Sequence, residues 1–206
     1  MNISIVTPVL NCSELIPVYQ KSTAGAEVVI VDNASTSPHA ENWREFAKGA
    51  GGIYIRNNEN RRFAPANNQG MRMATGDILL FMNNDVECGA GWLDQVARDV
   101  KPGGLYGVSL LSKHGIDYLE GFCIAAHRHT WLTLGGWDET LPGMYWEDNF
   151  LALHAAQIGV TLHRCRWPVY HYTNYTSRNT PGAYDRSAGN EREFVRRVME
   201  WREGAR

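Results

Sequence analysis

The sequence predicts an α/β fold built around a mostly parallel central sheet. Within the first 85 residues, short β-branched apolar runs alternate with segments of helical character. These runs are apolar almost throughout, which is typical of parallel strands covered on both faces. Two of them lead into acidic turns, at Asp32 and Asp85, which places carboxylates where open α/β sheets bind their ligands. The first half is therefore predicted to be doubly wound and Rossmann-like.

The first half contains four predicted strands separated by three predicted helices. Pro8 stops the first strand because proline cannot donate to a ladder, and Gly51 and Gly76 follow the ends of helices. The predicted strands are residues 3–9, 27–33, 53–56 and 78–82. The predicted helices are residues 12–22, 39–50 and 66–74, with a polar loop at residues 57–65.

The second half is less regular. Its predicted helices are residues 92–100, a short helix ending at residue 134, and residues 149–158 and 191–202. Its predicted strands are residues 106–111, 120–127, 160–165 and 168–171. Residues 174–186 are rich in Asn, Ser, Thr, Pro and Gly, which predicts a mobile loop. Neither a repeat nor a linker divides the chain, so we expect one domain over residues 1–206.

Composition limits the classes of protein. A chain of 206 residues is long enough for one substantial core, and its net charge of -2 gives no general attraction to nucleic acid or anionic membrane. Its four cysteines are Cys12, Cys88, Cys123 and Cys165. They are widely separated in the sequence, which favours reduced thiols over a zinc site. No basic segment precedes the first strand, and no apolar run approaches the ~18 residues of a membrane span. We therefore expect a cytoplasmic protein without an integral membrane segment.

The segment at residues 76–85 is the most informative part of the chain. An apolar strand runs directly into Asn83, Asn84 and Asp85. A carboxylate at this position can hold a divalent cation, and the cation can hold a diphosphate. Asn and Asp are also favoured turn residues. On this segment alone, a metal site and a simple polar turn are equally good interpretations.

Five segments occur along the chain in a specific order. They are residues 6–11 (VTPVLN), 29–35 (VIVDNAS), 63–70 (FAPANNQG), 76–85 (GDILLFMNND) and 135–139 (GGWDE), the last leading to residues 146–148 (WED). In this order they resemble the family 2 glycosyltransferases, inverting enzymes of the GT-A fold. The resemblance covers nearly the whole chain. It implies a nucleotide-binding half at residues 1–85 and an acceptor-binding half at residues 86–206, with a smaller mixed sheet on the acceptor side.

The resemblance implies that the nucleotide is bound by loops after the first two strands and by the segments around the fourth. The residues concerned are Thr7, Pro8, Asn11, Asp32, Asn67, Gly70 and Asn84. Asp32 would accept hydrogen bonds from a base N–H or from ribose hydroxyls. The alternative for Asp32 is a turn or helix N-cap. The alternative for Asn67 and Gly70 is a helix N-terminus with a small packing residue.

The resemblance also implies a metal site. Asp85 matches the metal-binding member of an Asp-x-Asp element, although Asn83 replaces its first acid. His171 matches a histidine that some relatives supply as a further ligand, and an imidazole would favour Mn²⁺ over Mg²⁺. The alternative for His171 is a place in an aromatic packing strand, between Tyr170 and Tyr172.

An inverting transfer needs a general base to deprotonate the acceptor hydroxyl. The resemblance places this base in the Glu147–Asp148 pair, with Asp148 as the first choice and Glu147 as the second. Acidic residues in a first turn also complement a helix dipole, so helix capping is the alternative. The predicted donor and acceptor pocket contains Arg62, Glu120, Gly121, Trp137 and Trp146. Trp131 is predicted to lie in the core, and Arg62 is otherwise a solvated loop residue.

The predicted function is metal-dependent transfer of a sugar from a nucleoside-diphosphate sugar, with UDP the commonest nucleotide in the family. The acceptor is a hydroxyl on a glycan, a protein, a lipid-linked molecule or a modified nucleic acid. The alternative is an inactive relative that only binds a nucleotide sugar or a partner. A nucleotidyltransferase is disfavoured, because residues 8–14 lack the Gly and Lys of a phosphate-binding loop. The tail is locally basic and would either bind an acidic acceptor or form a solvated helix face. Its arginines are Arg178, Arg186, Arg192, Arg196, Arg197 and Arg202.

Overall fold

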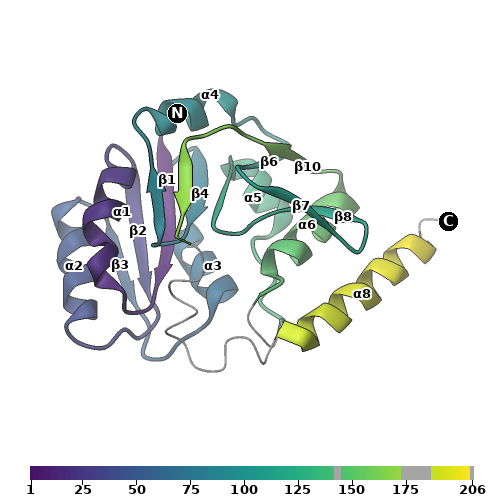
Figure 1. Cartoon of the computed structure of the whole chain (residues 1–206), viewed down its shortest axis with the longest axis horizontal. Helices are drawn as coiled ribbons and strands as arrows, with labels where there is room; N and C mark the ends of the chain where they lie inside the picture. Colours follow the sequence, from purple (N-terminus) through teal and green to yellow (C-terminus); the bar gives the residue numbers. More distant parts are fainter. Residues whose placement is uncertain (142–144, 173–186, 205–206) are drawn as a thin grey trace.

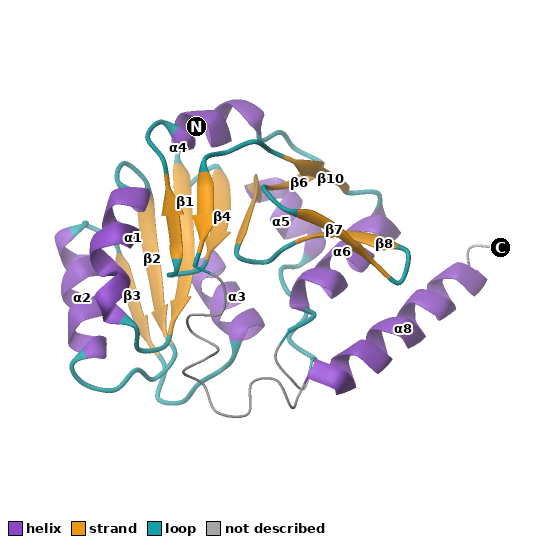
Figure 2. Cartoon of the chain, viewed as in Figure 1, coloured by secondary structure: helices purple, strands orange, loops and turns teal. Residues whose placement is uncertain are grey.

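The computed structural model describes residues 1–141, 145–172 and 187–204. Seven strands form a central sheet in the order β10-β6-β9-β4-β1-β2-β3, and two two-stranded sheets lie beside it. Helices cover both faces of the central sheet (Figure 1 and Figure 2). The predicted α/β fold with a mostly parallel sheet is confirmed. The predicted loop at residues 174–186 lies outside the described residues.

The first half follows the predicted order closely. The parallel strands are β1 (Ile3–Val9), β2 (Glu27–Asp32), β3 (Ile53–Arg56) and β4 (Ile78–Met82). The helices are η1 (Ser13–Leu15), α1 (Ile16–Thr23), α2 (His39–Gly49) and α3 (Phe63–Met73). The predicted start of the third helix was wrong by three residues. Pro65 lies in the first turn of α3, where a missing N–H costs no hydrogen bond.

The strands of the second half extend the same sheet. They are β6 (Gly104–Gly107), β9 (Cys123–His127) and β10 (Thr161–Arg164), with β9 antiparallel to both β4 and β6. The smaller sheets are two separate antiparallel pairs. They consist of β5 (Val86–Cys88) with β11 (Val169–His171), and β7 (Leu110–Lys113) with β8 (Ile116–Leu119). Sequence patterns missed β5 and the β7–β8 hairpin, because β5 has three residues and β7 is largely exposed.

Four helices complete the second half: α4 (Trp92–Asp99), α5 (Arg128–Leu134), α6 (Glu147–Ile158) and α8 (Ser187–Gly204). Both α6 and α8 begin earlier than predicted. Phe194 and Val198 of α8 pack with Trp146 and Phe150 at the start of α6, so the last helix lies along the outer side of the second half of the chain (Figure 1). No helix in the described part of the chain has the length and apolar composition that crossing a bilayer requires.

Both faces of the parallel strands are buried, as their continuous apolar runs predicted. Along β1, Ile5 belongs to the cluster under α1, α2 and α4, whereas Val6 belongs to the cluster under α3, α5 and α6. Gly70 of α3 lies directly against this second face. A Cβ atom at Gly70 would overlap Val6 Cγ1 and lie 3.1 Å from Val31 Cγ2. Gly70 thus permits the close approach of α3 to the sheet.

Gly70→Ala should lower the free energy of unfolding by about 1–3 kcal/mol, because the added methyl group overpacks the core. Urea unfolding measures this loss. Gly49→Ala is the matched control, since a Cβ atom there meets nothing within 4 Å. It should be neutral or slightly stabilising. Equal stability of the two variants would contradict tight packing of α3 on β1.

Candidate active site

The loops that follow the parallel strands meet along the edge formed by the carboxyl ends of β1, β2 and β4. Most of the non-glycine residues with a left-handed backbone conformation lie in the segments around this edge. Six of the seven non-glycine residues with positive φ in the described part of the chain belong to these segments: Asn11, Cys12, Ala34, Arg62, Tyr145 and Trp146. Such conformations are unfavourable for L-residues and cluster at ligand sites. This edge is therefore the candidate active site.

At the tip of β1, polar side chains are used to hold neighbouring loops. Asn11 Oδ1 accepts hydrogen bonds from the backbone N–H and the hydroxyl of Thr36, at 2.8 and 3.0 Å. The hydroxyl of Thr7 is buried and lies 2.6 Å from the hydroxyl of Tyr19. Pro8 is half-buried between them. Of these three predicted nucleotide-binding residues, Thr7 and Asn11 have internal hydrogen-bond partners.

Asp32 ends β2 and is 0% exposed. Its Oδ1 accepts from the Ser35 N–H at 2.7 Å, and its Oδ2 accepts from the Tyr54 hydroxyl at 2.5 Å and from Arg56 Nη1 at 2.7 Å. Arg56 reaches Asp32 because the two residues are paired in register between β2 and β3. Burial and the adjacent carboxylate raise the pKa of Tyr54 to about 12, which keeps its hydroxyl a donor. Both oxygens of Asp32 are thus occupied within the protein.

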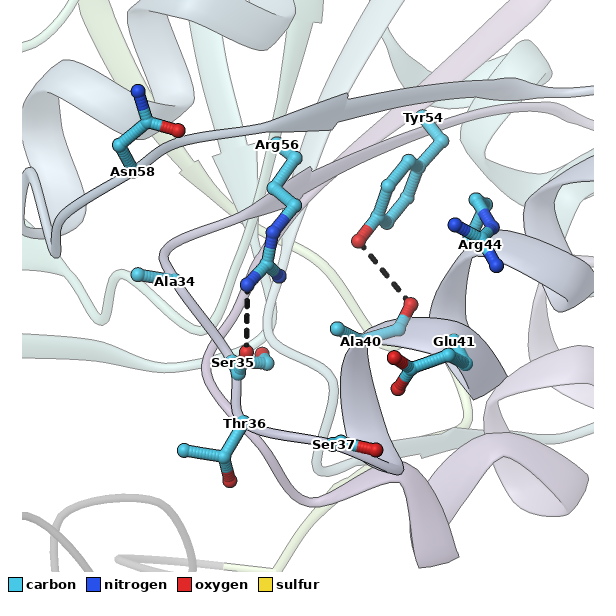
Figure 3. Close-up of a pocket in the computed structure, with 10 residues that line it drawn as sticks. All are labelled: Ala34, Ser35, Thr36, Ser37, Ala40, Glu41, Arg44, Tyr54, Arg56 and Asn58. Atoms are coloured by element: carbon cyan, nitrogen blue, oxygen red, sulfur yellow. Dashed lines mark hydrogen bonds between the residues drawn. The ribbon is translucent and has the colours of Figure 1, made fainter.

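A cavity of about 500 Å³ lies beside this cluster, between the 34–37 loop, α2 and β3. Arg56 Nη2 donates to the Ser35 carbonyl at 3.0 Å, and the Tyr54 hydroxyl also lies 3.2 Å from the Ala40 carbonyl. Figure 3 shows the Arg56 guanidinium extending from β3 toward the loop, with Glu41 and Arg44 contributed by α2. The lining residues are Ala34, Ser35, Thr36, Ser37, Ala40, Glu41, Arg44, Tyr54, Arg56 and Asn58.

The two predicted metal ligands lie next to each other beyond the tip of β4. His171 is paired with Val86 in the β5–β11 sheet. This pairing puts His171 Nε2 3.2 Å from Oδ1 of the buried Asp85, although 86 residues separate them in the chain. The His171 ring is stacked on Phe122 with ring centroids 4.3 Å apart. Pairing of two short strands therefore assembles this site.

The chemistry of this pair suits a divalent cation. A carboxylate oxygen facing an imidazole nitrogen is a ligand set that fits Mn²⁺, and the carboxylate also fits Mg²⁺. Within residues 1–141, 145–172 and 187–204, no three His, Cys, Asp or Glu side chains form a larger metal-binding group. Two protein ligands match a cation whose other positions are filled by phosphate oxygens and water. The residues present therefore fit the metal that the sequence predicted.

Asp148 and Glu147 occupy the first turn of α6. Asp148 is half-buried, and its Oδ2 accepts from the Gly121 N–H at 3.1 Å while its Oδ1 accepts from the Asn149 N–H at 2.9 Å. Burial raises the pKa of Asp148 to about 6, and the charge of Glu120 adds to this effect. Burial also raises the pKa of Glu147 to about 7, with a further increase from Asp148. Such values suit general acid–base chemistry near neutral pH.

The segment between β8 and β9 joins these two clusters. Gly121 donates its N–H to Asp148, whereas the next residue, Phe122, packs its ring on His171. The Phe122 carbonyl also accepts from the Asn83 N–H at 2.9 Å. The predicted base and the predicted metal ligands are therefore attached to adjacent residues of one short segment.

A sequence model of the family described as glycosyl transferase family 2 matches residues 4–116, more than half of the chain. The chain belongs to glycosyl transferase family 2. The matched region includes Asp32 and Asp85 but ends before Asp148. No curated protein matches the chain significantly by sequence.

Solved structures share the fold of this glycosyltransferase-family chain at low identity. The mannosyltransferase PcManGT from Pyrobaculum calidifontis, in complex with GDP-Man and Mn²⁺, has a TM-score of 0.65 at 21% identity over 80% of this chain and 54% of its own. TarS from S. aureus has a TM-score of 0.65 at 15% identity, over 83% and 36%. GalNAc-T7 with UDP, GalNAc and Mn²⁺ has 0.67 at 17%, over 83% and 44%. The predicted family and GT-A fold are thus confirmed, and the chain spans about half the length of these proteins or less.

Two other residues predicted for the donor and acceptor pocket of this family 2 member, Arg62 and Trp137, have different surroundings. Arg62 Nη1 donates to the Leu141 carbonyl at 2.7 Å, which connects the two halves of the chain. The ring of Trp137 is buried and packs edge-on against Phe63 and Phe81. Its Nε1 atom has no hydrogen-bond partner in the described part of the chain. Contact of Trp137 with a substrate stays a prediction.

The other two tryptophans have clear packing roles. Trp146 is buried and stacks on His114, with ring centroids 5.9 Å apart, below the ammonium group of Lys113. Trp131 is fully buried beside Phe81, as predicted for a core residue. Glu120 is half-buried at the edge. Trp146 therefore packs in the cluster between α6 and α8, and its contact with a substrate stays a prediction.

Neighbouring asparagines of α3 have contrasting surroundings. Asn68 holds the 135–139 turn, because its amide donates to the Trp137 carbonyl and accepts from the Trp137 N–H, both at 2.8 Å. Asn67 is fully buried, and its Oδ1 and Nδ2 lack hydrogen-bond partners among the described residues. A buried amide without partners is costly. Asn67 is therefore the predicted nucleotide-binding residue with the clearest capacity for a ligand.

Sequence patterns missed Tyr54, Arg56 and Asn68. Tyr54 and Arg56 alternate along an edge strand next to Asp32, and this period-2 spacing of polar groups was the signal that could have identified them. Asn68 gave no signal, because its partner Trp137 is 69 residues away in sequence.

Two of the four arginines of α8, Arg196 and Arg197, have acidic partners. Arg196 pairs with Glu193 and Glu200, and Arg197 pairs with Asp138 at 2.7 Å. Exposed pairs of this kind contribute little stability, but they neutralise the local charge. The described part of the tail therefore fits a solvated helix face better than a site for an acidic acceptor.

Glu147→Gln should raise stability above pH 7 by about 2 kcal/mol, because the folded protein no longer has to ionise a buried carboxyl. A raised pKa lowers stability as pH increases from the unfolded value to about 7. The gain should therefore vanish at pH 4, where Glu147 is largely protonated in both the folded and the unfolded protein. Thermal unfolding at both pH values measures it, with the exposed Glu59→Gln as control. A pH-independent difference would contradict the raised pKa of Glu147.

Proposed function

We propose that this protein is a metal-dependent, inverting glycosyltransferase that moves a sugar from a nucleoside-diphosphate sugar to a hydroxyl acceptor, with UDP-sugars the first donors to test. One observation carries the proposal. The Asp148 carboxylate and the Asp85–His171 pair contact two adjacent residues, Gly121 and Phe122, at the carboxyl edge of the sheet. This arrangement would put the site for the diphosphate leaving group and the site for the general base within one active site.

Asp85 and His171 would hold Mn²⁺ or Mg²⁺ at the end of β4. When bound there, the cation neutralises charge on the diphosphate leaving group. The nucleotide would lie along the tips of β1 and β2, beside Pro8. Asn67 would donate to or accept from the donor, which supplies the partners that its buried amide lacks. Asn84, buried beside Asp85, completes this half of the site.

Asp148 would take the proton of the acceptor hydroxyl. The N–H groups of Gly121 and Asn149 fix its two oxygens, so the carboxylate is oriented before substrate arrives. The acceptor oxygen attacks the anomeric carbon, the bond to the diphosphate breaks, and the proton moves to Asp148. Inversion in one displacement needs no covalent enzyme intermediate. Glu147 is the second candidate for the base.

The acceptor would bind on the side of residues 86–206, near Glu120 and the first turn of α6. Glu120 and, above about pH 6, Asp148 give this side a negative character, whereas Glu147 becomes charged only above about pH 7. This favours an uncharged hydroxyl acceptor over a phosphorylated one. An inactive, nucleotide-sugar-binding relative is the alternative, and Asn83 in place of an acid is the observation that favours it.

Asp85→Ala should abolish Mn²⁺-dependent binding of UDP, because the cation loses its carboxylate ligand. Thermal unfolding with UDP, with and without Mn²⁺, measures this as loss of the metal-dependent stabilisation. Asp94→Ala is the control, since Asp94 is an exposed residue of α4. An unchanged shift in Asp85→Ala would remove Asp85 from the site.

Asp148→Asn should leave donor binding intact and lower kcat by about 10²–10⁴-fold. In the wild type, kcat/KM should rise with pH through about 6, because Asp148 must be ionised to act as a base. UDP release in the presence of neutral glycan acceptors measures both. If Asp148→Asn keeps its activity and Glu147→Gln loses it, the base is Glu147.

A further inference from the structure

We propose that Arg56 selects the base of the nucleotide donor by donating to a ring carbonyl, so that keto bases are accepted and amino bases are rejected. Uracil and guanine belong to the first class, and cytosine and adenine to the second. The inference rests on the proposed function, since it assigns the base specificity of the same donor site.

The buried carboxylate of Asp32 does not offer a free oxygen to a base. It is 0% exposed, and it already accepts hydrogen bonds from Ser35, Tyr54 and Arg56. The exposed member of this cluster is Arg56, whose side chain is 44% exposed. The cluster therefore presents donors, rather than a carboxylate, to a ligand.

The guanidinium of Arg56 is already fixed in place. Nη1 donates to Asp32 and Nη2 donates to the Ser35 carbonyl, and each nitrogen keeps a second hydrogen for a ligand. Figure 3 shows this group at the wall of the cavity of about 500 Å³. A guanidinium held by two protein oxygens loses little further freedom when it binds a ligand. It can therefore discriminate between ligands at low entropic cost.

The position of the cavity matches the length of a nucleoside diphosphate. Arg56 ends β3, and Asp85 follows β4, with β2 and β1 between them. Neighbouring strands are about 4.8 Å apart, so the two ends of the site are separated by roughly 14 Å. An extended nucleoside diphosphate is of comparable length. A base in the cavity thus leaves its diphosphate near Asp85 and His171, with the ribose passing Ser35 and Thr36.

Arginine offers only donors, and this decides which bases fit. The carbonyl at C4 of uracil or C6 of guanine can accept from Arg56. Cytosine and adenine carry an amino group at the corresponding position, which would face the guanidinium N–H groups. Donor would then face donor, and the base would lose its hydrogen bond to the fixed guanidinium, which a site built to hydrogen-bond a carbonyl penalises.

Isothermal titration of UDP, CDP, GDP and ADP with Mn²⁺ tests the inference, because each keto nucleotide has an amino counterpart of the same ring size. The wild type should bind UDP at least about tenfold more tightly than CDP, and GDP more tightly than ADP. In Arg56→Gln both ratios should fall toward one, since a carboxamide can donate or accept. Arg98→Gln, an exposed arginine of α4, should keep the wild-type ratios.

Equal binding of UDP and CDP by the wild type would overturn the inference. The inference would also be overturned if a folded Arg56→Gln variant lost affinity for all four nucleotides by the same factor, because a purely structural role of Arg56 predicts that result. If Arg56→Gln does not fold, the wild type is titrated with the diphosphate of 2-pyrimidinone riboside, which lacks the C4 carbonyl. It should bind as weakly as CDP, and binding equal to UDP would refute Arg56 as the reader. If no nucleotide binds with Mn²⁺, the proposed function itself fails.

Discussion

The antiparallel return of β9 along β4 determines where chemistry can take place in this protein. Cys123 at the start of β9 is paired with Met82 at the end of β4. The residues just before β9 therefore reach the same edge as the carboxyl ends of the parallel strands. A parallel β9 would have begun at the opposite edge, and Gly121 could not have met Asp148. The direction of one strand thus brings residues of the second half of the chain to the edge formed by the first half.

Burial of charge is the second constraint, and it acts differently at the two ends of the edge. Asp32 is buried with an arginine and two other donors, so its charge is compensated within the protein. Glu147 is buried and Asp148 is half-buried, neither has a direct cationic partner in the described structure, and their pKa values rise. The first environment suits a fixed structural anion. The second suits a group that exchanges a proton during a reaction.

Sequence patterns predicted the order of nearly all elements of the first half, because buried parallel strands leave continuous apolar runs. Resemblance also predicted Asp85 and His171 as metal ligands, and the structure brings these two side chains together. Sequence patterns could not show that the side chains of Thr7 and Asn11 have internal partners, since hydrogen bonds between distant loops leave no local pattern. The short strands β5 and β7 escaped for a related reason. Each is stabilised by its partner strand rather than by its own composition.

The contact between Asp32 and Arg56 also limits how the protein can diverge. A substitution of Arg56 alone would leave a buried carboxylate without its cation, and a substitution of Asp32 alone would release the guanidinium from its fixed position. Either single step is costly, so the two positions are expected to change together or not at all. Among descendants of this chain, these two residues should therefore covary more strongly than other neighbours on β2 and β3.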